Sequence, residues 1–330
     1  MRKLRIGLIG CGAFGESYLA ALGGIPTAEV VAVADVLPER ARRLAERYHV
    51  PHVTSGIAEL VARSDIDAVG VVTTENQHLE PVLAALQGGK HVIVEKPMAT
   101  RLEDAQRMAR AAIDHDRFLM PGHLLRFEPR CAMVKQQLLE GRLGRVLFVA
   151  ARRNRSKGQG RTYKRTPLVL ETAIHDIDLM LWFTGQKVKS VRGWTVSATL
   201  GEEADLFCAV LNFAGGAIGM LHTSWLLPDH AARLDDQLQV LTTDGGANID
   251  VLNSGLSLWS NSGVESPDVT YEPRVNGYAQ GALREQLAYF TQCCLEGRKP
   301  AIVSADDGVE AVKVSLALIQ SAQENRPIEL

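Results

Sequence analysis

The chain has 330 residues, 46% of them hydrophobic, and a formal net charge of −2 at pH 7. This length allows two domains with hydrophobic cores, and the near-neutral charge excludes a strongly basic nucleic-acid-binding chain. No segment approaches the roughly 18 uninterrupted apolar residues of a membrane span, and the short apolar run near the N-terminus stops in glycines, unlike a signal peptide. The five cysteines lack metal-ligand spacing, so we expect reduced thiols in a cytoplasmic protein.

The first 120 residues or so alternate strand and helix patterns. Short β-branched apolar runs predict strands over residues 3–9, 29–35, 67–73 and 91–94. Apolar residues with a 3.6-residue period predict helices over residues 14–22, 38–48, 78–87 and 102–115. Strands that are apolar throughout are typical of a parallel sheet covered by helices on both faces. The pattern predicts a Rossmann-type, doubly wound α/β domain over residues 1–121.

The pattern changes after Pro121-Gly122. A helix, a strand, a basic loop and a second helix are predicted first, over residues 128–140, 145–151, 152–165 and 173–183. Longer strands follow over residues 187–198, 205–213, 217–226 and 237–242, with glycine turns that favour an antiparallel sheet. Two helices end the chain, over 282–296 and 305–323. We expect a second α/β domain over residues 122–330, with the option that its C-terminal helix packs back on the first domain.

A glycine turn lies between the first predicted strand and the first predicted helix. Residues 10–15, Gly-Cys-Gly-Ala-Phe-Gly, have the form G-x-G-x-x-G. The first glycine permits the tight turn, the second leaves room for a pyrophosphate, and the third lets the helix pack closely. Free N–H groups and the helix dipole favour phosphate at this point. We therefore expect a dinucleotide at Gly10, Gly12, Ala13, Phe14 and Gly15.

Asp35 ends the second predicted strand, twenty residues after Gly15. A carboxylate at this point accepts hydrogen bonds from the ribose hydroxyls and repels a 2′-phosphate, which favours NAD over NADP. Arg40, Arg42 and Arg43 follow closely, so NADP stays possible. The alternative for Asp35 is a helix cap or a surface acid.

Lys96 follows the predicted strand 91–94 at its carboxyl end, where doubly wound sheets bind ligands. Its ammonium can donate a hydrogen bond to a substrate oxygen and stabilise negative charge that develops there. Pro97 disfavours helix at the preceding residue, so the lysine is presented from an extended segment. The alternative is a solvated lysine.

A second set of candidates lies on the predicted helix near residue 175. Glu171 precedes His175 by four residues and Asp178 follows it by three, which predicts one helix face. An imidazole can accept a hydroxyl proton near neutral pH. Glu171 could orient it, stabilise its cation or bind a substrate hydroxyl, while Asp178 suits a supporting contact. We expect no metal site, because two strong neutral ligands are lacking and hydride transfer needs no metal.

Residues 152–165 hold seven Lys or Arg residues and no acid. Because guanidinium groups bind carboxylates and phosphates, an anionic sugar derivative held by Arg153 is one interpretation. A solvated or intersubunit loop is the other. Arg126 is a further substrate-binding candidate, with a structural ion pair as its alternative. Aromatic residues do not interleave the basic run, so nucleic-acid binding is not expected.

Taken together, these motifs resemble those of the Gfo/Idh/MocA family, the glucose–fructose oxidoreductases, inositol dehydrogenases and their relatives. The similar features span nearly the whole chain: the glycine turn, Asp35, Thr73 with His78, Glu95-Lys96-Pro97, Gly122-His123-x-x-Arg126-Phe127 and the run LETAIHDIDLMLWFTG at 170–185. The resemblance implies a Rossmann domain followed by an α/β domain with an open, mainly antiparallel sheet. That sheet commonly forms oligomer contacts, which implies a homodimer or homotetramer.

The resemblance also implies roles for single residues. Lys96 and His175 correspond to the catalytic lysine and histidine of the family. Many members carry an aspartate four residues before that histidine, where this chain has Glu171, which is longer by one methylene. Thr74 replaces the usual proline of the Thr-Pro-x-x-x-His segment. The cofactor-binding residues implied in the same way are Thr73, His78, Glu95 and Lys96.

We therefore expect an NAD(P)-dependent dehydrogenase or reductase that acts on a secondary alcohol or carbonyl of a sugar, a sugar derivative or a cyclitol. One alternative is a redox-neutral isomerase or glycosidase that retains its NAD and turns over without net NADH change. Another is a non-catalytic NAD(H)-binding regulator, which would not need the Lys96 and His175 pair. The expected partners are a small-molecule substrate and further copies of the chain, with no nucleic acid and no membrane.

Overall fold

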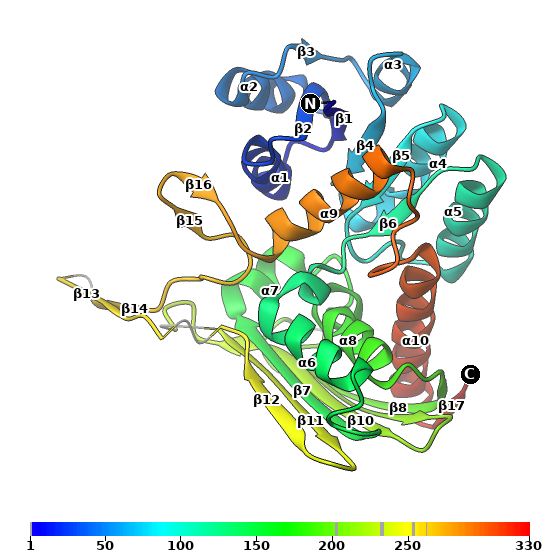
Figure 1. The fold of residues 1–330 in the computed structure, drawn as a ribbon. Coiled ribbons are helices and arrows are strands. Elements are labelled where there is room, and N and C mark those ends of the chain that lie inside the picture. Colours follow the sequence, from blue (N-terminus) through cyan, green and yellow to red (C-terminus); the bar gives the residue numbers. More distant parts are fainter. Residues whose placement is uncertain (1, 202–203, 232–233, 253–254, 262) are drawn as a thin grey trace. The chain divides into compact units, whose positions relative to one another are not determined.

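The computed structural model describes residues 2–201, 204–231, 234–252, 255–261 and 263–330 (Figure 1). The chain forms two compact units. The first unit contains Met1–Phe127 and Tyr271–Val309, and the second contains Glu128–Thr270 and Glu310–Leu330. Among the described residues, no helix combines the length and the hydropathy that crossing a membrane requires.

The first unit is built on a six-stranded parallel sheet with the order β3-β2-β1-β4-β5-β6. The strands are β1 (Leu4–Ile9), β2 (Ala28–Ala34), β3 (His52–Val53), β4 (Ala68–Val71), β5 (His91–Val94) and β6 (Leu119–Pro121). This is the strand order of doubly wound nucleotide-binding domains, so the predicted fold class is confirmed. The order reverses between β1 and β4, and ligands bind such sheets at the carboxyl ends of these strands.

Helices connect the strands of this sheet. They are α1 (Ala13–Gly23), α2 (Pro38–Tyr48), α3 (Ile57–Ala62), α4 (Leu79–Gln87) and α5 (Leu102–Asp114), with 3-10 turns η1 (Glu75–Gln77) and η2 (Leu124–Phe127). Sequence periodicity predicted four of these five helices. It missed α3, β3 and β6, because each has six residues or fewer and gives too short a window for a period.

Helix α9 (Ala282–Glu296) belongs to the first unit although it lies far along the chain. Its buried Leu283, Leu287 and Phe290 join the core around Leu8 and Tyr18. This packing explains why the observed division differs from the single boundary expected after residue 121. The first unit extends to Phe127, and a second segment of the chain, Tyr271–Val309, completes it.

The second unit is built on a seven-stranded sheet with the order β12-β11-β7-β10-β9-β8-β17. The strands are β7 (Val146–Ser156), β8 (Val188–Val196), β9 (Leu206–Phe213), β10 (Ile218–Leu227), β11 (Asp235–Thr242), β12 (Gly246–Asp250) and β17 (Ile328–Glu329). Only the β7–β10 pair is parallel among these neighbours, so the expected mainly antiparallel sheet is confirmed.

Helices α6 (Pro129–Leu139), α7 (Lys157–Tyr163) and α8 (Ile174–Thr184) lie over one face of this sheet (Figure 1). A π-helical segment, η3 (Val169–Ala173), leads directly into α8, and α10 (Ala305–Glu324) ends in this unit. The opposite face carries side chains that are about half exposed, such as Trp194 at 46% and Met220 at 47%.

The prediction of a loop over residues 152–165 is wrong. Strand β7 continues to Ser156, and α7 follows it at once. The reason is a capping box, in which the Ser156 hydroxyl accepts the Gln159 N–H at 3.2 Å and the Gln159 side chain bonds the Ser156 backbone. Five of the seven basic residues of this segment therefore lie on regular elements, and Lys164 and Arg165 lie in the turn that follows α7.

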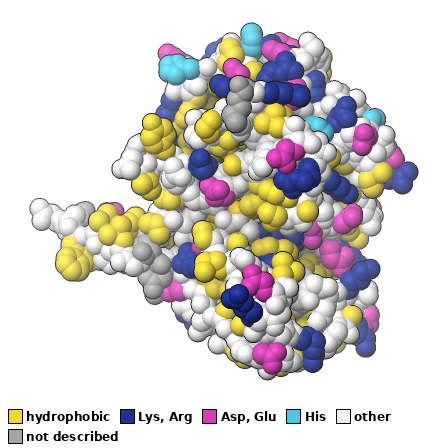
Figure 2. Space-filling model, in the orientation of Figure 1, with side chains coloured by type: hydrophobic (Ala, Val, Ile, Leu, Met, Phe, Trp, Pro, Cys, Tyr) yellow, Lys and Arg dark blue, Asp and Glu magenta, His cyan; other side chains and the backbone are white. Residues whose placement is uncertain are grey.

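Two short hairpins complete the described chain. They are β13 (Leu258–Ser260) with β14 (Gly263–Glu265), and β15 (Arg274–Val275) with β16 (Tyr278–Ala279). Figure 2 shows hydrophobic side chains gathered on the first hairpin, where Trp259 is 82% exposed. On the rest of the face that Figure 2 draws, positive and negative side chains are intermixed, in keeping with the net charge of −2.

Candidate active site

The glycine turn joins β1 to α1. Gly10 has φ +104°, and a Cβ there would lie 2.3 Å from the Val72 carbonyl oxygen, so only glycine fits. A Cβ at Gly15 would lie 2.2 Å from the Gly10 carbonyl oxygen, which shows how closely the helix approaches the turn. Nothing lies within 4 Å of the Cβ position at Gly12, the residue before α1. The turn is thus tight on the protein side and open at the helix start, which fits a pyrophosphate.

Asp35 follows β2 and its carboxylate accepts two backbone N–H groups. One oxygen accepts the Cys11 N–H at 2.7 Å, and the other accepts the Leu37 N–H at 2.8 Å. These bonds fix the glycine turn against the end of β2. A carboxylate offers further lone pairs, so Asp35 can still accept a ribose hydroxyl. Burial, reinforced by the Asp35 charge, raises the pKa of the Cys11 thiol to about 12.

Glu95 lies between α1 and Lys96. Its carboxylate is buried and accepts the Tyr18 O–H at 2.6 Å on one oxygen and the Lys96 backbone N–H at 3.1 Å on the other. A Cβ at Gly122 would lie 2.7 Å from the same carboxylate, so the close approach requires glycine. Burial, with the charge of Glu95, raises the pKa of Tyr18 well above its usual value. The helix that follows the glycine turn is therefore tied to the segment that carries Lys96.

His78 is buried, with 1% exposure, between the segments that follow β4 and β5. Its Nδ1 lies 3.0 Å from the Pro97 carbonyl oxygen, and its Nε2 lies 3.2 Å from the Thr73 carbonyl oxygen. Burial lowers the pKa of His78, and a neutral ring donates to only one of these acceptors at a time. The ring therefore packs between the Thr73 and Pro97 carbonyl groups and bonds one of them at a time, and the cofactor contact that the resemblance implied for His78 stays a prediction.

Arg126 is also buried, at 3% exposure, within the first unit. Its guanidinium donates to the Ile302 carbonyl oxygen at 2.7 Å and to the Asp307 carboxylate at 3.1 Å. The structural ion pair that the sequence left open is thus present. Both bonds direct the guanidinium to acceptors of the protein itself, so the substrate contact predicted for Arg126 has no support in this geometry.

Glu171 and His175 lie on the segment from η3 into α8. Glu171 is 9% exposed in the π-helical turn, His175 is half-buried in the first turn of α8, and Asp178 is 1% exposed one turn later. The sequence predicted the helix but not the π-helical turn, for which periodicity gives no signal. Turns of this rare type frequently lie at functional sites.

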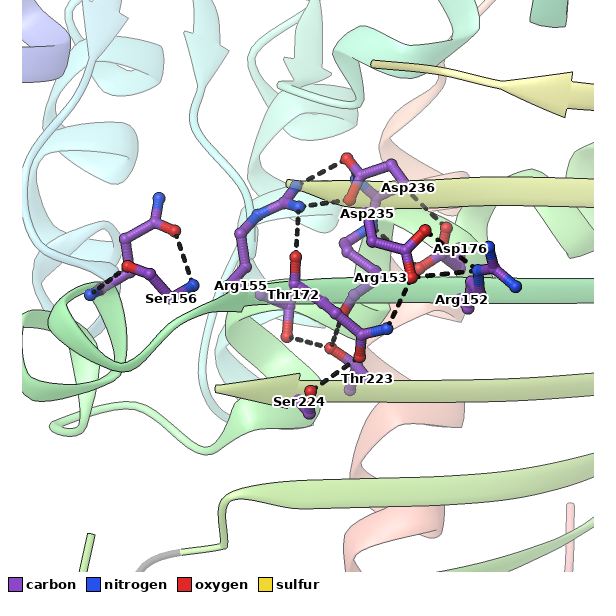
Figure 3. Close-up of polar contacts among 12 residues, drawn as sticks. Arg152, Arg153, Arg155, Ser156, Thr172, Asp176, Thr223, Ser224, Asp235 and Asp236 are labelled. Atoms are coloured by element: carbon purple, nitrogen blue, oxygen red, sulfur yellow. Dashed lines mark hydrogen bonds and ion pairs between the residues drawn. The ribbon is translucent and has the colours of Figure 1, made fainter. Parts of the chain in front are cut away.

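Arg153 lies in a buried cluster of charges (Figure 3). Its guanidinium donates to both Asp176 oxygens, at 2.8 and 2.9 Å, and to Asp236 at 2.6 Å. Burial raises the pKa of Asp176, against the opposing effect of Arg153. Because Arg153 is 2% exposed and holds two carboxylates, the structure does not support the predicted contact with an anionic substrate.

Other cations of residues 152–165 are paired as well. Arg155 donates to Asp236 at 2.7 Å, Arg152 pairs with Asp235 at 3.0 Å, and Arg161 pairs with Asp229. These acids lie some 70 to 80 residues further along the chain. The local sequence therefore shows only the positive charges and not the aspartates that neutralise them. These four pairs weaken the case for an anionic substrate held by Arg152, Arg153, Arg155 or Arg161.

Sequence reasoning missed three polar residues that support these sites: Tyr18, Asp176 and Asp236. A signal for Asp176 was present, since it stands in the run His-Asp-Ile-Asp next to His175. The sequence gives no indication that Tyr18 bonds a buried carboxylate, because an aromatic residue on an amphipathic helix is usually interpreted as part of the core.

The two domains, a dinucleotide-binding fold and an α/β fold with an open sheet, define a class of two-domain nucleotide-dependent enzymes. A model for the oxidoreductase family with NAD-binding Rossmann fold matches residues 4–123, and a model for the GFO/IDH/MocA C-terminal domain matches residues 131–248. Together these two matches cover most of the chain. The chain belongs to the Gfo/Idh/MocA family of oxidoreductases, and its first unit is the NAD-binding domain.

Similar proteins include inositol dehydrogenases. The chain is 28% identical over 339 residues to the myo-inositol 2-dehydrogenase of Thermotoga maritima, which covers 99% of this chain and 98% of that protein. It is 35% identical over 193 residues to the inositol 2-dehydrogenase of Acidothermus cellulolyticus, over 58% of this chain and little more than half, 56%, of that protein. A crystal structure of a probable dehydrogenase from Thermotoga maritima has a TM-score of 0.83 at 25% identity, with 99% and 98% of the two chains covered.

Proposed function

We propose that this oxidoreductase oxidises a secondary alcohol of a cyclitol or a neutral sugar, with NAD as the hydride acceptor. The observation that carries this proposal is the full-length similarity to a myo-inositol 2-dehydrogenase, over 99% of the chain. The pairing of Arg152, Arg153, Arg155 and Arg161 with aspartates supports a neutral substrate over an anionic one.

The cofactor is proposed to lie at the glycine turn. Gly12 leaves room for the pyrophosphate, and the N–H groups at the start of α1, including those of Ala13 and Phe14, bind it. Asp35 accepts the ribose hydroxyls, which favours NAD over NADP. Thr73, which follows β4, and Glu95, which follows β5, hold the backbone at the carboxyl ends of these strands. When bound, NAD supplies the hydride acceptor of the reaction.

The catalytic roles are proposed for three residues. Lys96 donates a hydrogen bond to the reacting oxygen and stabilises its developing negative charge. His175 accepts the proton of the substrate hydroxyl. Glu171 stabilises the resulting imidazolium. Its side chain is one methylene longer than the usual aspartate, so its carboxylate lies further from the backbone.

The test is absorbance of NADH on mixing the protein with NAD and a panel of inositols, aldoses and sugar acids. We expect NADH to form with an inositol or a neutral sugar. Lys96→Ala and His175→Ala should each lower kcat by about 100-fold or more, with NAD affinity little changed. Glu171→Gln should lower kcat less than His175→Ala does.

The alternatives give different results in the same assay. Substrate turnover without net NADH would indicate a redox-neutral reaction on retained NAD. NAD binding with no turnover of any compound in the panel would favour a regulator. Full activity of the Lys96→Ala variant would refute the role assigned to that residue.

We also propose that the protein is cytoplasmic and forms a homodimer or homotetramer through the uncovered face of the second sheet. The five free cysteines and the half-exposed hydrophobic side chains on that face, including Ile218, Met220 and Leu241, support this. Light scattering of the wild type and of Met220→Asp tests the assembly, and we expect the variant to dissociate.

A further inference from the structure

Two side chains fix the Glu171–His175 segment to the second sheet, and both bonds lead to Arg153. The first is the Asp176 carboxylate, which accepts two parallel N–H groups of the Arg153 guanidinium at 2.8 and 2.9 Å (Figure 3). A bidentate pair of this kind fixes orientation as well as distance. Because Asp176 is the neighbour of His175, the pair sets the position of the first turn of α8 on β7.

The second attachment starts at Thr172, the neighbour of Glu171. Its hydroxyl donates to the Leu168 carbonyl oxygen at 2.6 Å and lies 3.0 Å from the Thr223 hydroxyl of β10. The single proton of the Thr223 hydroxyl is donated either to the Thr172 hydroxyl or to the Arg153 backbone carbonyl oxygen, which lies 2.7 Å away. Both threonines are buried, at 5% and 0% exposure, so water does not compete for these bonds.

The spacing of the two attachments matches the spacing of the candidate catalytic pair. Thr172 and Asp176 are four residues apart, and each directly follows one member of the pair Glu171 and His175. Fixing residues 172 and 176 on the sheet therefore fixes the backbone from which both candidate side chains project. Arg153 contacts both attachments: its guanidinium donates to Asp176, and its carbonyl oxygen is an acceptor for Thr223.

The charges around Arg153 balance within the buried cluster. Asp236, at 0% exposure, accepts from Arg153 at 2.6 Å and from Arg155 at 2.7 Å, so two guanidinium groups face two carboxylates. Hydrophobic residues could fill such a site with equal or greater stability, whereas ion pairs of fixed geometry specify one arrangement. Arrangement, more than stability, is what a catalytic helix requires.

We propose that Arg153 and Thr223 are positioning residues for His175 and Glu171, acting through Asp176 and Thr172. This inference rests on the proposed function, since it assumes that His175 and Glu171 act on the substrate. Arg153 thus holds no substrate, and its role is to set where the proton acceptor lies.

The chain offers matched variants for each attachment. Arg153→Lys keeps the charge but loses the bidentate fork, and Arg152→Lys is its control, because Arg152 is the adjacent residue of β7 and pairs with the adjacent Asp235. Thr223→Val keeps the shape but removes the hydroxyl, and Thr223→Ser restores it. Thermal unfolding identifies any variant that fails to fold. If Arg153→Lys fails to fold, Thr223→Val and Thr223→Ser still test the proposal.

We expect Arg153→Lys and Thr223→Val to lower kcat by about 10- to 100-fold while KM and NAD affinity change by less than about threefold. Arg152→Lys and Thr223→Ser should remain near the wild type. Hydrogen exchange, which needs no substrate, should be faster in residues 169–178 of Arg153→Lys and Thr223→Val than in their controls.

The outcomes separate this inference from the proposed function. If His175→Ala is inactive while Arg153→Lys and Thr223→Val keep the wild-type kcat and exchange rates, the positioning role is overturned and the proposed function stands. If the wild type oxidises nothing in the panel, the proposed function fails. If hydrogen exchange in residues 169–178 is also unchanged in Arg153→Lys and Thr223→Val, the proposal that these residues hold the segment on the sheet fails as well. Equal losses in Arg152→Lys and Arg153→Lys would likewise refute the positioning role.

Discussion

Gly10 and Gly12 are two residues apart in one turn, yet they are glycines for different reasons. At Gly10 a Cβ would meet the Val72 carbonyl oxygen at 2.3 Å, whereas at Gly12 it would meet no protein atom within 4 Å. The first glycine is required by the fold, and the second leaves open the space that we propose for the pyrophosphate. The two roles can be separated by experiment.

We expect Gly12→Ala to keep the melting temperature of the wild type and to bind NAD at least about tenfold more weakly, because a methyl group enters the pyrophosphate space. Gly10→Ala should instead destabilise the fold by about 1–3 kcal/mol or more, from its positive φ and the contact with Val72. Thermal unfolding and NAD titration of both variants check this. Normal NAD affinity in Gly12→Ala would contradict the proposed cofactor position.

Tyr18 is a second single residue with a separable effect. Tyr18→Phe removes the donor to the buried Glu95 carboxylate, so we expect a loss of about 1.5–3 kcal/mol in the free energy of unfolding. Since Glu95 also accepts the Lys96 backbone N–H, kcat should fall as well. Urea unfolding and steady-state kinetics measure the two effects. Tyr48→Phe is the control, because its hydroxyl makes two long contacts, each of 3.4 Å, with Glu16 and with Arg274. Equal losses in both variants would contradict a specific role for the Tyr18 hydroxyl.

At the scale of elements, the start of α10 combines a cap and an ion pair. The Asp307 carboxylate accepts the Ser304 N–H at 2.7 Å and its hydroxyl at 2.6 Å, while the Ser304 hydroxyl accepts the Asp307 N–H at 3.2 Å. Burial alone would raise the pKa of Asp307, but the charge of Arg126 and the bonds from Ser304 outweigh it and lower the pKa. The ionised form therefore stabilises the folded state.

This sign predicts a pH dependence. The contribution of Asp307 is fully present above the ordinary carboxyl pKa of about 3.9 and is lost as the pH falls through the lowered folded value. We expect Asp307→Asn to lower the free energy of unfolding by about 1–2 kcal/mol at neutral pH, and the difference from wild type to shrink at acid pH. Urea unfolding at several pH values measures it. Asp306→Asn, an exposed neighbour in the same helix turn, should show a smaller effect.

The sequence predicted those elements whose signal is local. Periodicity found α2, β5 and α9 with the bounds that the structure has, since an 11-residue amphipathic stretch or an apolar run carries its own pattern. The same reasoning placed residues 152–165 in a loop, because the serine cap that starts α7 was read as part of a basic segment. Capping and π-helical turns depend on single hydrogen bonds that periodicity does not contain.

The candidate site was predictable where residue type and motif position decide, and not where distant partners decide. The glycine turn, Lys96 and His175 follow from motifs. That Arg153 faces Asp176 and Asp236, or that His78 lies between two carbonyl groups, depends on residues brought together by the fold. Because its partners lie far away in the sequence, Arg153 was predicted to bind substrate, whereas the structure shows it in a buried ion pair.

At the scale of the whole molecule, the first unit is discontinuous in sequence. Its core includes Leu283, Leu287 and Phe290 of α9 together with Leu8 and Tyr18. We expect a fragment of residues 1–127 to be unstable and to bind NAD poorly by itself. Co-expression with residues 271–309 should restore folding and NAD binding, measured by circular dichroism and by titration. Full NAD affinity of residues 1–127 alone would refute the division.

The burial of the cysteines has a consequence for the chemistry of the whole chain. Burial raises the pKa of all five thiols, Cys11, Cys131, Cys208, Cys293 and Cys294, and none forms a disulfide. Since the thiolate is the form that reacts with alkylating agents and peroxides, a raised pKa lowers the reactivity of these thiols at neutral pH. We therefore expect iodoacetamide to label the buried Cys11, Cys131 and Cys293 more slowly than the partly exposed Cys208 and Cys294 in the folded protein, and all five thiols to react faster once the protein unfolds.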